Sequence, residues 1–246
     1  MSAVALVTGA TSGIGRATAK AFAARGDRIV FTGRRREKGD ALAEEITAAG
    51  GTAIFVEADV GDEAASRRVV AKALETFGQL DYAFNNAGIE GELGPLASIA
   101  EANVDRVLQT NLKGVLWGMK HQVSAMSTGG VIVNNASVAA LVGMPGAAVY
   151  SASKGAVIAA SRSVAHEVAG QGIRVNVISP AGTYSEAFNR FFNNDAAQIQ
   201  AFAEQHALRR IAQPEEVAAT VLWLCSGASS FVTAQNIVVD GGLTTH

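Results

Sequence analysis

Residues 4–24 read VALVTGATSGIGRATAKAFAA, and this stretch decides the fold. Residues 4–8 form a strand-like run, Ile14 to Ala24 carry helical periodicity, and a glycine-rich turn joins the two. Such a turn lets the backbone approach a pyrophosphate, while the helix N-terminus offers free N–H donors and partial positive charge. The stretch therefore predicts a dinucleotide-binding turn, made by Gly9, Thr11, Ser12, Gly13, Ile14 and Gly15.

The rest of the chain repeats the alternation of strand and helix. Strand-like runs recur at 28–32, 53–57, 80–84, 131–135, 173–178 and 236–239, with helical periodicity in most of the intervals. Their residues are apolar in succession, which suits strands covered on both faces. We expect residues 1–246 to form a single α/β domain, a Rossmann-like doubly wound parallel sheet of about seven strands with helices on both faces.

Composition excludes several classes of partner. The chain has 20 basic and 22 acidic residues and a net charge of −2, so it presents no electrostatic footprint for a nucleic acid or an anionic membrane. No apolar run reaches membrane-spanning length, and the first strand begins too near Met1 to leave room for a signal peptide. We expect a cytoplasmic protein without a metal site, with Cys225 buried as a small hydrophobe.

The second predicted strand ends at Gly33, where a site for NAD usually places an acidic residue. Arg34, Arg35 and Arg36 follow, and arginine offers the forked donors that match phosphate oxygens. The sequence thus favours NADP(H), contacted through Gly33, Arg34 and Arg35, with NAD(H) possible. The alternative is that these arginines only form the solvated start of a helix, in which case Arg34 is the one most expected to contact the cofactor.

Tyr150 and Lys154 are one helical turn apart, so the phenol and the ammonium lie on one helix face. A neighbouring cation favours phenolate, and we therefore expect Lys154 to lower the pKa of Tyr150. A tyrosine tuned in this way exchanges a proton near neutral pH. Ser137 precedes this pair and supplies a second hydroxyl.

These motifs together resemble the classical short-chain dehydrogenase/reductase superfamily over essentially the full length of the chain. The matching elements occur in the order of that family: the turn 8–15, Asp59-Val60, Asn85-Asn86-Ala87-Gly88, Asn111, Ser137, Tyr150-Ser-Ala-Ser-Lys154, 176–180, 214–218 and Asp240-Gly241-Gly242. The resemblance implies an NAD(P)(H)-dependent oxidoreductase of the carbonyl reductase or secondary alcohol dehydrogenase type.

The resemblance also implies a role for each matching residue. Tyr150 would be the general acid in reduction and the base in oxidation, and Ser137 would polarise the carbonyl oxygen. Lys154 would lower the tyrosine pKa and bind the nicotinamide ribose, and Asn111 would hold a water in a proton relay. For Asn111 the alternative is a side chain bonded to helix backbone.

Further contacts with the cofactor follow from the resemblance. Asp59 would accept from the adenine amino group beside Val60, and Asn86, Ala87 and Gly88 would pass under the adenosine ribose. Pro180, Ala181, Gly182 and Thr183 would flank the nicotinamide. This last segment departs from the family pattern, because the usual Pro-Gly reads Pro180-Ala181-Gly182 and a nearby threonine is replaced by Ser185.

A long excursion at 181–207 holds Phe188, Phe191, Phe192 and Phe202, four of the ten phenylalanines in the chain. We expect a mobile lid or substrate wall there. The alternative is a peripheral helical pair with its own small core. The predicted substrate pocket is largely apolar, and its residues are Val138, Leu141, Val142, Met144, Tyr184, Phe188, Phe191 and Phe202.

An apolar wall favours a bulky or aromatic ketone, or the matching secondary alcohol, over a sugar. Glu90 and Glu92 fit solvated loop charges better than catalytic groups. One alternative is a β-ketoacyl carrier-protein reductase, although residues 127–130 and 170–172 lack the basic side chains expected for an acidic carrier. Another is a non-catalytic module that senses nicotinamide. The helices expected at 101–126 and 150–169 carry more apolar surface than one core needs, at Trp117, Met119, Ala159 and Val164, and so predict self-association into a homotetramer.

Overall fold

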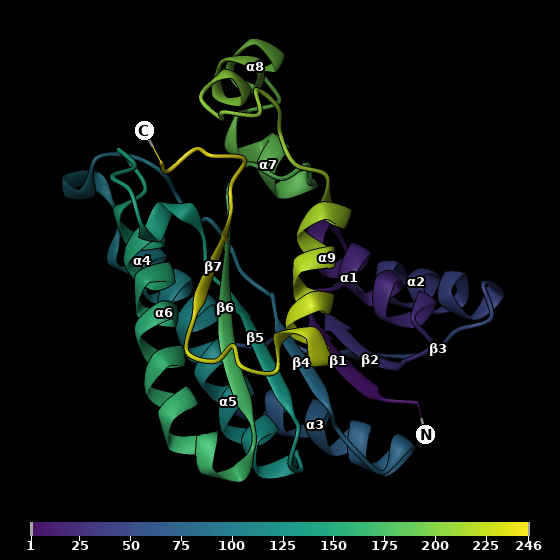
Figure 1. The fold of residues 1–246 in the computed structure, drawn as a ribbon. Coiled ribbons are helices and arrows are strands. Elements are labelled where there is room, and N and C mark those ends of the chain that lie inside the picture. Colours follow the sequence, from purple (N-terminus) through teal and green to yellow (C-terminus); the bar gives the residue numbers. More distant parts are fainter. Residues whose placement is uncertain (1, 246) are drawn as a thin grey trace.

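The computed structural model describes residues 2–245, and its centre is one seven-stranded parallel sheet (Figure 1). The strands lie in the spatial order β3-β2-β1-β4-β5-β6-β7, so the strand order reverses between β1 and β4. Their bounds are β1 Val4–Thr8, β2 Arg28–Gly33, β3 Thr52–Glu57, β4 Tyr82–Asn85, β5 Val131–Asn135, β6 Arg174–Pro180 and β7 Asn236–Val239. The predicted fold class is confirmed, and ligands of such sheets bind at the carboxyl ends of the strands beside the reversal.

Helices cover both faces of the sheet. One layer packs α1 Gly13–Ala24, α2 Arg36–Ala48 and α9 Pro214–Leu224, and the other packs α3 Glu63–Phe77, α5 Gly114–Ala125 and α6 Ala148–Val168 (Figure 1). Successive residues of β1 explain why its run is apolar throughout. Leu6 belongs to the core beneath α3, α5 and α6, whereas Ala5 and Val7 belong to the core beneath α1 and α9. Side chains alternate between the faces of a strand, and both faces are covered here.

The helix expected at 101–126 is interrupted. Residues Glu101–Leu108 form α4, a π-helical turn follows at Gln109–Lys113, and α5 begins at Gly114. A π turn widens the helix and often marks a functional position. Asn111 lies inside it and is fully buried.

Beyond the carboxyl end of β6 stand two short helices, α7 Glu186–Phe191 and α8 Ala196–Glu204, which we call the α7–α8 pair (Figure 1). Their aromatic rings form a small cluster of their own. The ring centroids of Phe192 lie 5.0 Å from Phe188 and 5.2 Å from Phe202. The segment is thus a helical pair with its own small core, the alternative that the sequence left open. Its expected mobility stays a prediction.

Two expectations about single side chains have different outcomes. Cys225 is buried, as expected, and burial raises the pKa of its thiol to about 12. Met119 was expected to add apolar surface together with Trp117, but only 2% of Met119 is exposed, because it points into the core beneath α5. Among residues 2–245, no helix combines the length and apolar character needed to span a membrane.

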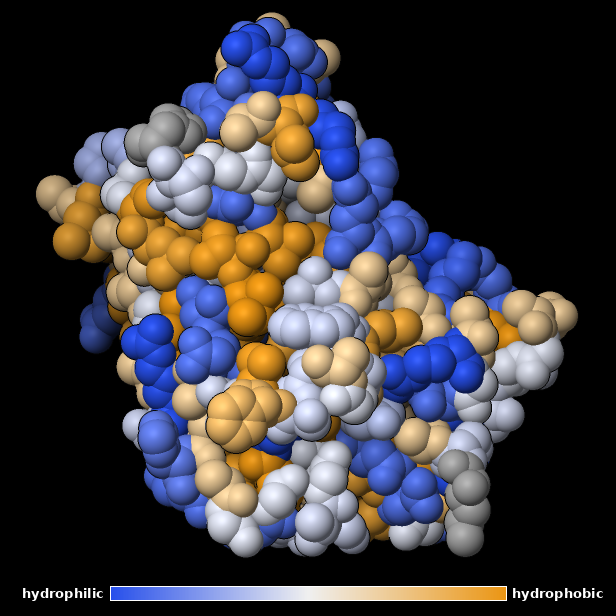
Figure 2. All heavy atoms as spheres, in the orientation of Figure 1, coloured by the Kyte–Doolittle hydropathy of each residue, from blue (hydrophilic) through white to orange (hydrophobic). Residues whose placement is uncertain are grey.

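The face drawn in Figure 2 carries a band of apolar residues below the α7–α8 pair, in the region where Figure 1 shows β7. This strand forms one edge of the sheet, and Val238 is 39% exposed there. An uncovered apolar sheet edge is a common site of association.

Candidate active site

The glycine turn packs against neighbouring loops so closely that side chains are excluded. Gly9 adopts a φ of 65°, and a Cβ there would lie 2.7 Å from the Cα of Ala87. A Cβ on Gly33 would lie 2.6 Å from the side chain of Thr11. Only glycine tolerates such contacts and such a backbone, so the turn is pressed onto the exits of β2 and β4.

Asn86 ties three strand exits together. Its Nδ2 donates to the carbonyl of Thr8 at 3.0 Å and of Gly9 at 3.2 Å, and its Oδ1 accepts from Nδ2 of Asn135 at 3.0 Å. The Thr8 hydroxyl in turn accepts from the backbone N–H groups of Asn86 and Ala87. The predicted ribose-binding segment is therefore also a structural brace for the floor of the site.

A cavity of about 370 Å³ opens between these loops. Most of the residues expected to contact a dinucleotide line it: Gly9, Thr11, Ser12, Gly13, Ile14, Gly33, Arg34, Arg35, Asp59, Val60, Asn86, Ala87, Gly88, Tyr150 and Lys154. Gly15 does not line it, because a Cβ there would lie 2.5 Å from the carbonyl of Gly9, inside the packed turn.

The three arginines after β2 have different partners. Arg36 pairs with Glu57 at 2.7 Å, whereas Arg34 lines the cavity 3.9 Å from Asp59. Arg35 donates to the hydroxyls of Thr11 and Ser12, and it also pairs with Glu186 of α7. Arg34 and Arg35 thus lie at the expected cavity, whereas Arg36 lies outside its lining.

Ser137, Tyr150 and Lys154 meet at the end of β5 and the start of α6. Ser137 follows β5 and caps a short helical turn, and its hydroxyl bonds with that of Tyr150. The Nζ of Lys154 donates to the Asn135 carbonyl at 2.7 Å and lies 5.8 Å from the centroid of the Tyr150 ring. The carboxyl end of β5 and one face of α6 thus bring the three predicted catalytic residues together.

The pKa values in this site differ from the expectation for Tyr150. Burial raises the pKa of Tyr150 to about 12, and the hydrogen bond from Ser137 opposes this shift only partly. Burial also lowers the pKa of Lys154 to about 8. The expected lowering of the tyrosine pKa is therefore wrong for the protein alone. Desolvation disfavours the charged form of both groups. At Tyr150 this effect is larger than the attraction of a cation for phenolate.

The side chain of Asn111 forms hydrogen bonds with the protein itself. Its Oδ1 accepts from the backbone N–H of Ile89 at 2.8 Å, and its Nδ2 donates to the Ile89 carbonyl and to the Ser153 hydroxyl. Ser153 donates onward to the backbone carbonyl of Tyr150 at 2.7 Å. The amide thus connects the loop after β4 to α6, and one lone pair of Oδ1 remains for a water.

A second cavity of about 190 Å³ shares Tyr150 with the first and extends toward the α7–α8 pair. Its lining includes Ser137, Val138, Met144, Pro180, Ala181, Gly182, Thr183, Phe188, Phe191, Phe192 and Phe202. Leu141, Val142 and Tyr184 differ from the expectation, since they do not line this cavity and are 43%, 38% and 42% exposed. The helical turn after Ser137 ends at Ala140, and the chain then runs outward.

Glu90 lies in the site, although the sequence suggested a solvated loop charge. Its half-buried side chain lines both cavities, and its carboxylate raises the pKa of Tyr150 and of Lys154. Glu92 behaves as expected of a loop charge, since it is exposed and lies 3.8 Å from Arg106. Only the path of the loop distinguishes the two carboxylates.

Comparisons with known proteins agree with this geometry. A family model described as Enoyl-(Acyl carrier protein) reductase matches residues 9–244. The A-factor type gamma-butyrolactone 1'-reductase (1S-forming) of Streptomyces virginiae is 40% identical over 246 residues, which cover 98% of this chain and 95% of that protein. The chain belongs to the classical short-chain dehydrogenase/reductase superfamily. It is therefore an oxidoreductase acting on CH–OH or C=O groups with an NAD(P) cofactor.

Other short-chain dehydrogenases/reductases are similar along their whole length. The cyclohexanol dehydrogenase of Acinetobacter sp. (strain SE19) is 36% identical, with 98% of this chain and 95% of that protein covered. The crystal structure of levodione reductase superposes with a TM-score of 0.95 at 33% identity, covering 98% of this chain and 97% of that chain. The predicted superfamily is confirmed.

The residues around the larger cavity fit an NAD(P) cofactor. Its walls hold a glycine turn that leaves no space for side chains, the N-terminus of α1 and three arginines, Arg34, Arg35 and Arg190, which together suit a pyrophosphate and an adenosine. The end of the cavity reaches Tyr150, where the second, phenylalanine-lined cavity begins.

Proposed function

We propose that this chain is an NADP(H)-preferring reductase that converts a bulky, ring-bearing ketone to a secondary alcohol, reversibly. The observation that carries the proposal is the position of Tyr150 between the cavity at the glycine turn and a phenylalanine-lined one. A ketone in the second cavity would meet the hydroxyls of Ser137 and Tyr150 at its oxygen. Its apolar body would contact the aromatic rings of the α7–α8 pair.

The bound nicotinamide would supply the hydride, a reaction for which amino-acid side chains have no equivalent. Ser137 and Tyr150 would donate hydrogen bonds to the carbonyl oxygen, where negative charge develops. Tyr150 would then give its proton as general acid, and its raised pKa keeps it protonated at neutral pH. Lys154 would hold the ribose, and Asn111 would position a water between Lys154 and solvent.

The preference for NADP(H) rests on the charges beside the adenosine end of the cavity. Gly33 occupies the place of a ribose-binding carboxylate, and Arg34 and Arg35 both line the cavity. Lys38 adds a third cation nearby, from the first turn of α2. Loss of the carboxylate and gain of cations both favour a 2′-phosphate.

The substrate class rests on the lining of the second cavity and on the relatives. Several relatives are named for ring-bearing compounds, among them cyclohexanol and cis-4-hydroxycyclohexanecarboxylate dehydrogenases. We therefore extend the expected aromatic ketones to alicyclic ones. The residues 181–207 would act as the wall or lid of this pocket within a single catalytic domain that spans the chain.

The test is NADPH and NADH oxidation by purified protein with a panel of cyclohexanones, aryl ketones, polyols and an acetoacetyl thioester. Fastest turnover with a ring ketone and NADPH is expected. Fastest turnover with polyols would overturn the substrate class, and a lower Michaelis constant for NADH would overturn the cofactor preference. Preference for the thioester would instead favour a carrier-protein reductase, the alternative suggested by the description of the family model.

We also propose a cytoplasmic homotetramer. Trp117 and Val164 are half-buried on α5 and α6, Ala159 is exposed, and β7 offers an apolar sheet edge. Closed symmetric assemblies would cover both surfaces. Light scattering at micromolar concentration should give the mass of four chains, and a monomer would refute the assignment.

A further inference from the structure

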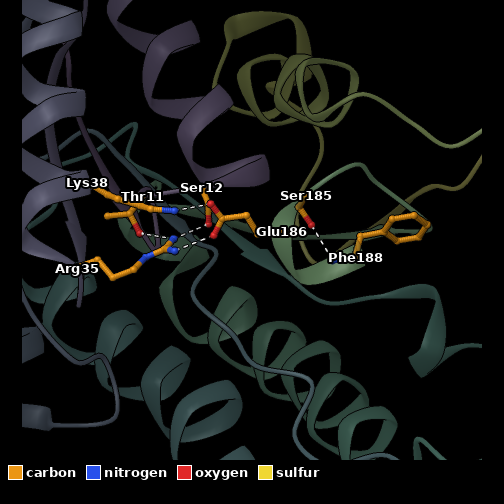
Figure 3. Close-up of polar contacts among 7 residues, drawn as sticks. All are labelled: Thr11, Ser12, Arg35, Lys38, Ser185, Glu186 and Phe188. Atoms are coloured by element: carbon orange, nitrogen blue, oxygen red, sulfur yellow. Dashed lines mark hydrogen bonds and ion pairs between the residues drawn. The ribbon is translucent and has the colours of Figure 1, made fainter. Parts of the chain in front are cut away.

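Glu186 is the first residue of α7, and its carboxylate binds two cations from a distant part of the chain (Figure 3). One carboxylate oxygen accepts from Nη1 of Arg35 at 2.7 Å, and the other accepts from the ammonium of Lys38. Together these contacts hold α7 against the start of α2. Both cations keep the pKa of Glu186 at about 2, so it is ionised at neutral pH.

The same guanidinium also serves the glycine turn. Nη2 of Arg35 donates to the Thr11 hydroxyl at 3.2 Å and to the Ser12 hydroxyl at 3.0 Å, as Figure 3 shows. Next to them, a Cβ on Gly13 would lie 3.0 Å from the Cβ of Ser185, the residue that caps α7. The start of α7 is therefore seated directly on the turn that would carry the cofactor phosphates.

The groups around this carboxylate form a set of donors suited to a phosphate. They comprise a guanidinium, an ammonium and two hydroxyls, all beside the N-terminus of α1. Glu186 lines both the cofactor cavity and a neighbouring cavity, which Lys38 also lines. Arg190 faces the cofactor cavity from the last turn of α7, while Arg16 is already paired with Glu45.

A carboxylate and a phosphate compete for such donors, because both are anions and the same guanidinium and ammonium would bind either of them. The contacts of Glu186 are about half exposed, with 49% of its side chain and 43% of that of Arg35 accessible. Exposed ion pairs of this kind are individually weak and break readily. A dianionic phosphate can therefore displace the carboxylate of Glu186, but breaking the existing ion pairs lowers the net affinity for the phosphate.

We propose that Glu186 is a specificity-determining residue, which competes with the 2′-phosphate of NADP(H) for Arg35 and Lys38 and thereby restrains the preference for NADP(H) over NAD(H). The proposal deepens the proposed function and rests on it for the identity of the cofactor. Binding of the 2′-phosphate releases α7 from the glycine turn. NAD(H), which lacks this phosphate, leaves the contact intact.

The test compares the full-length protein with Glu186→Gln, which keeps the size of the side chain and removes its charge. Glu204→Gln is the matched control, since Glu204 lies on α8 and is exposed, and among residues 2–245 its carboxylate accepts a hydrogen bond only from Gln200. Calorimetric titration with 2′,5′-ADP and with 5′-ADP measures the phosphate contribution without any turnover. Nicotinamide fluorescence gives the dissociation constants of NADPH and NADH.

Glu186→Gln is expected to tighten 2′,5′-ADP and NADPH about fivefold, the sum of two exposed ion pairs, and to leave 5′-ADP and NADH within about twofold. Glu204→Gln should change none of the four. In an Arg35→Ala background the gain from Glu186→Gln should shrink, because one of the two contested cations is gone.

An equal effect on all four ligands, no effect, or weaker binding of 2′,5′-ADP would overturn the proposal. These outcomes are separable from the cofactor preference itself. A wild-type protein that favours NADH, with a ratio that Glu186→Gln moves toward NADPH, refutes the proposed preference and supports the role of Glu186. A wild-type protein that favours NADPH, with an unchanged ratio in the variant, supports the proposed preference and refutes the role of Glu186.

Discussion

We call the ends of β4 and β5, together with Tyr150 and Lys154 of α6, the floor of the site. The floor and the α7–α8 pair lie on opposite sides of the second cavity, yet different forces hold them in place. The floor is fixed by buried, directional hydrogen bonds. Nδ2 of Asn85 donates to Asn134 at 2.8 Å and to Gln122 at 2.9 Å, and Asn134 donates to Ser161 of α6 at 2.8 Å. This network lies beneath Tyr150 and Lys154, between β4, β5, α5 and α6.

The α7–α8 pair has a looser construction. Edge-to-face and tilted aromatic rings hold its two helices together, and the exposed ion pairs of Glu186 connect it to the start of α2. Aromatic contacts tolerate a range of geometries, whereas a buried amide network tolerates very few. From this difference we expect the floor to determine the chemistry and the α7–α8 pair to determine which substrates reach it. Four substitutions test this division.

The largest effect is expected for Tyr150→Phe in the floor. Loss of the phenolic proton should lower kcat for ketone reduction about 10³-fold, while NADPH binding and the thermal midpoint stay unchanged. Tyr82→Phe is the control, since Tyr82 packs on Phe22 at the start of β4, remote from the site. Steady-state kinetics of both variants decide it. Retention of most activity by Tyr150→Phe would show that another group donates the proton.

The next effect concerns stability. Asn134→Ala leaves a buried N–H of Asn85 without its acceptor and removes the donor to Ser161, whose hydroxyl keeps its bond to the Val157 carbonyl. It should therefore lower the free energy of unfolding by about 2 kcal/mol. Gln205→Ala removes an exposed amide at the end of α8 and should stay within about 0.5 kcal/mol of wild type. Urea titration measures both. Equal values would mean that the floor is no more rigidly built than the α7–α8 pair.

In the α7–α8 pair, substitution should change selectivity before stability. Phe202→Ala removes a ring that lines the second cavity and packs on Phe188 and Phe192. The Michaelis constant for a ring ketone should rise about tenfold, and that for a small ketone should change little. Phe231→Ala, at a fully exposed ring, is the control. A uniform loss across both ketones would argue that this wall does not contact substrate.

The smallest effect is a shift in pH dependence. The Glu90 carboxylate raises the pKa of Lys154, which is about 8, so it helps Lys154 keep its proton. In the proposed mechanism the charged form of Lys154 supports reduction, and reductive kcat/KM should therefore fall as the pH rises through the pKa of Lys154. Glu90→Gln removes that support and should move the midpoint of this fall to lower pH. Glu92→Gln, on the same loop but exposed, should leave it in place.

Much of the site followed from local patterns. Each strand exit carries its motif within a few residues, as with Gly9 after β1 or Ser137 after β5, and parallel strands bring their carboxyl ends to one edge. The pair Tyr150 and Lys154 needed only the helical repeat. Leu141 and Val142 were misplaced because the turn after Ser137 ends sooner than a pocket wall would require, and nothing in their apolar character reveals that.

The sequence by itself determined the alternating α/β fold and the glycine turn, and it brought Ser137, Tyr150 and Lys154 forward as candidates, because these depend on short-range spacing and on strand order. Asn111 became a candidate only through the resemblance to the family. Only the tertiary structure decided the direction of the Tyr150 pKa, the inward path of Glu90 and the contact of Glu186 with Arg35 and Lys38. Desolvation and ion pairing depend on which distant segments surround a group, and the α7–α8 pair meets the glycine turn only once the sheet has brought them together.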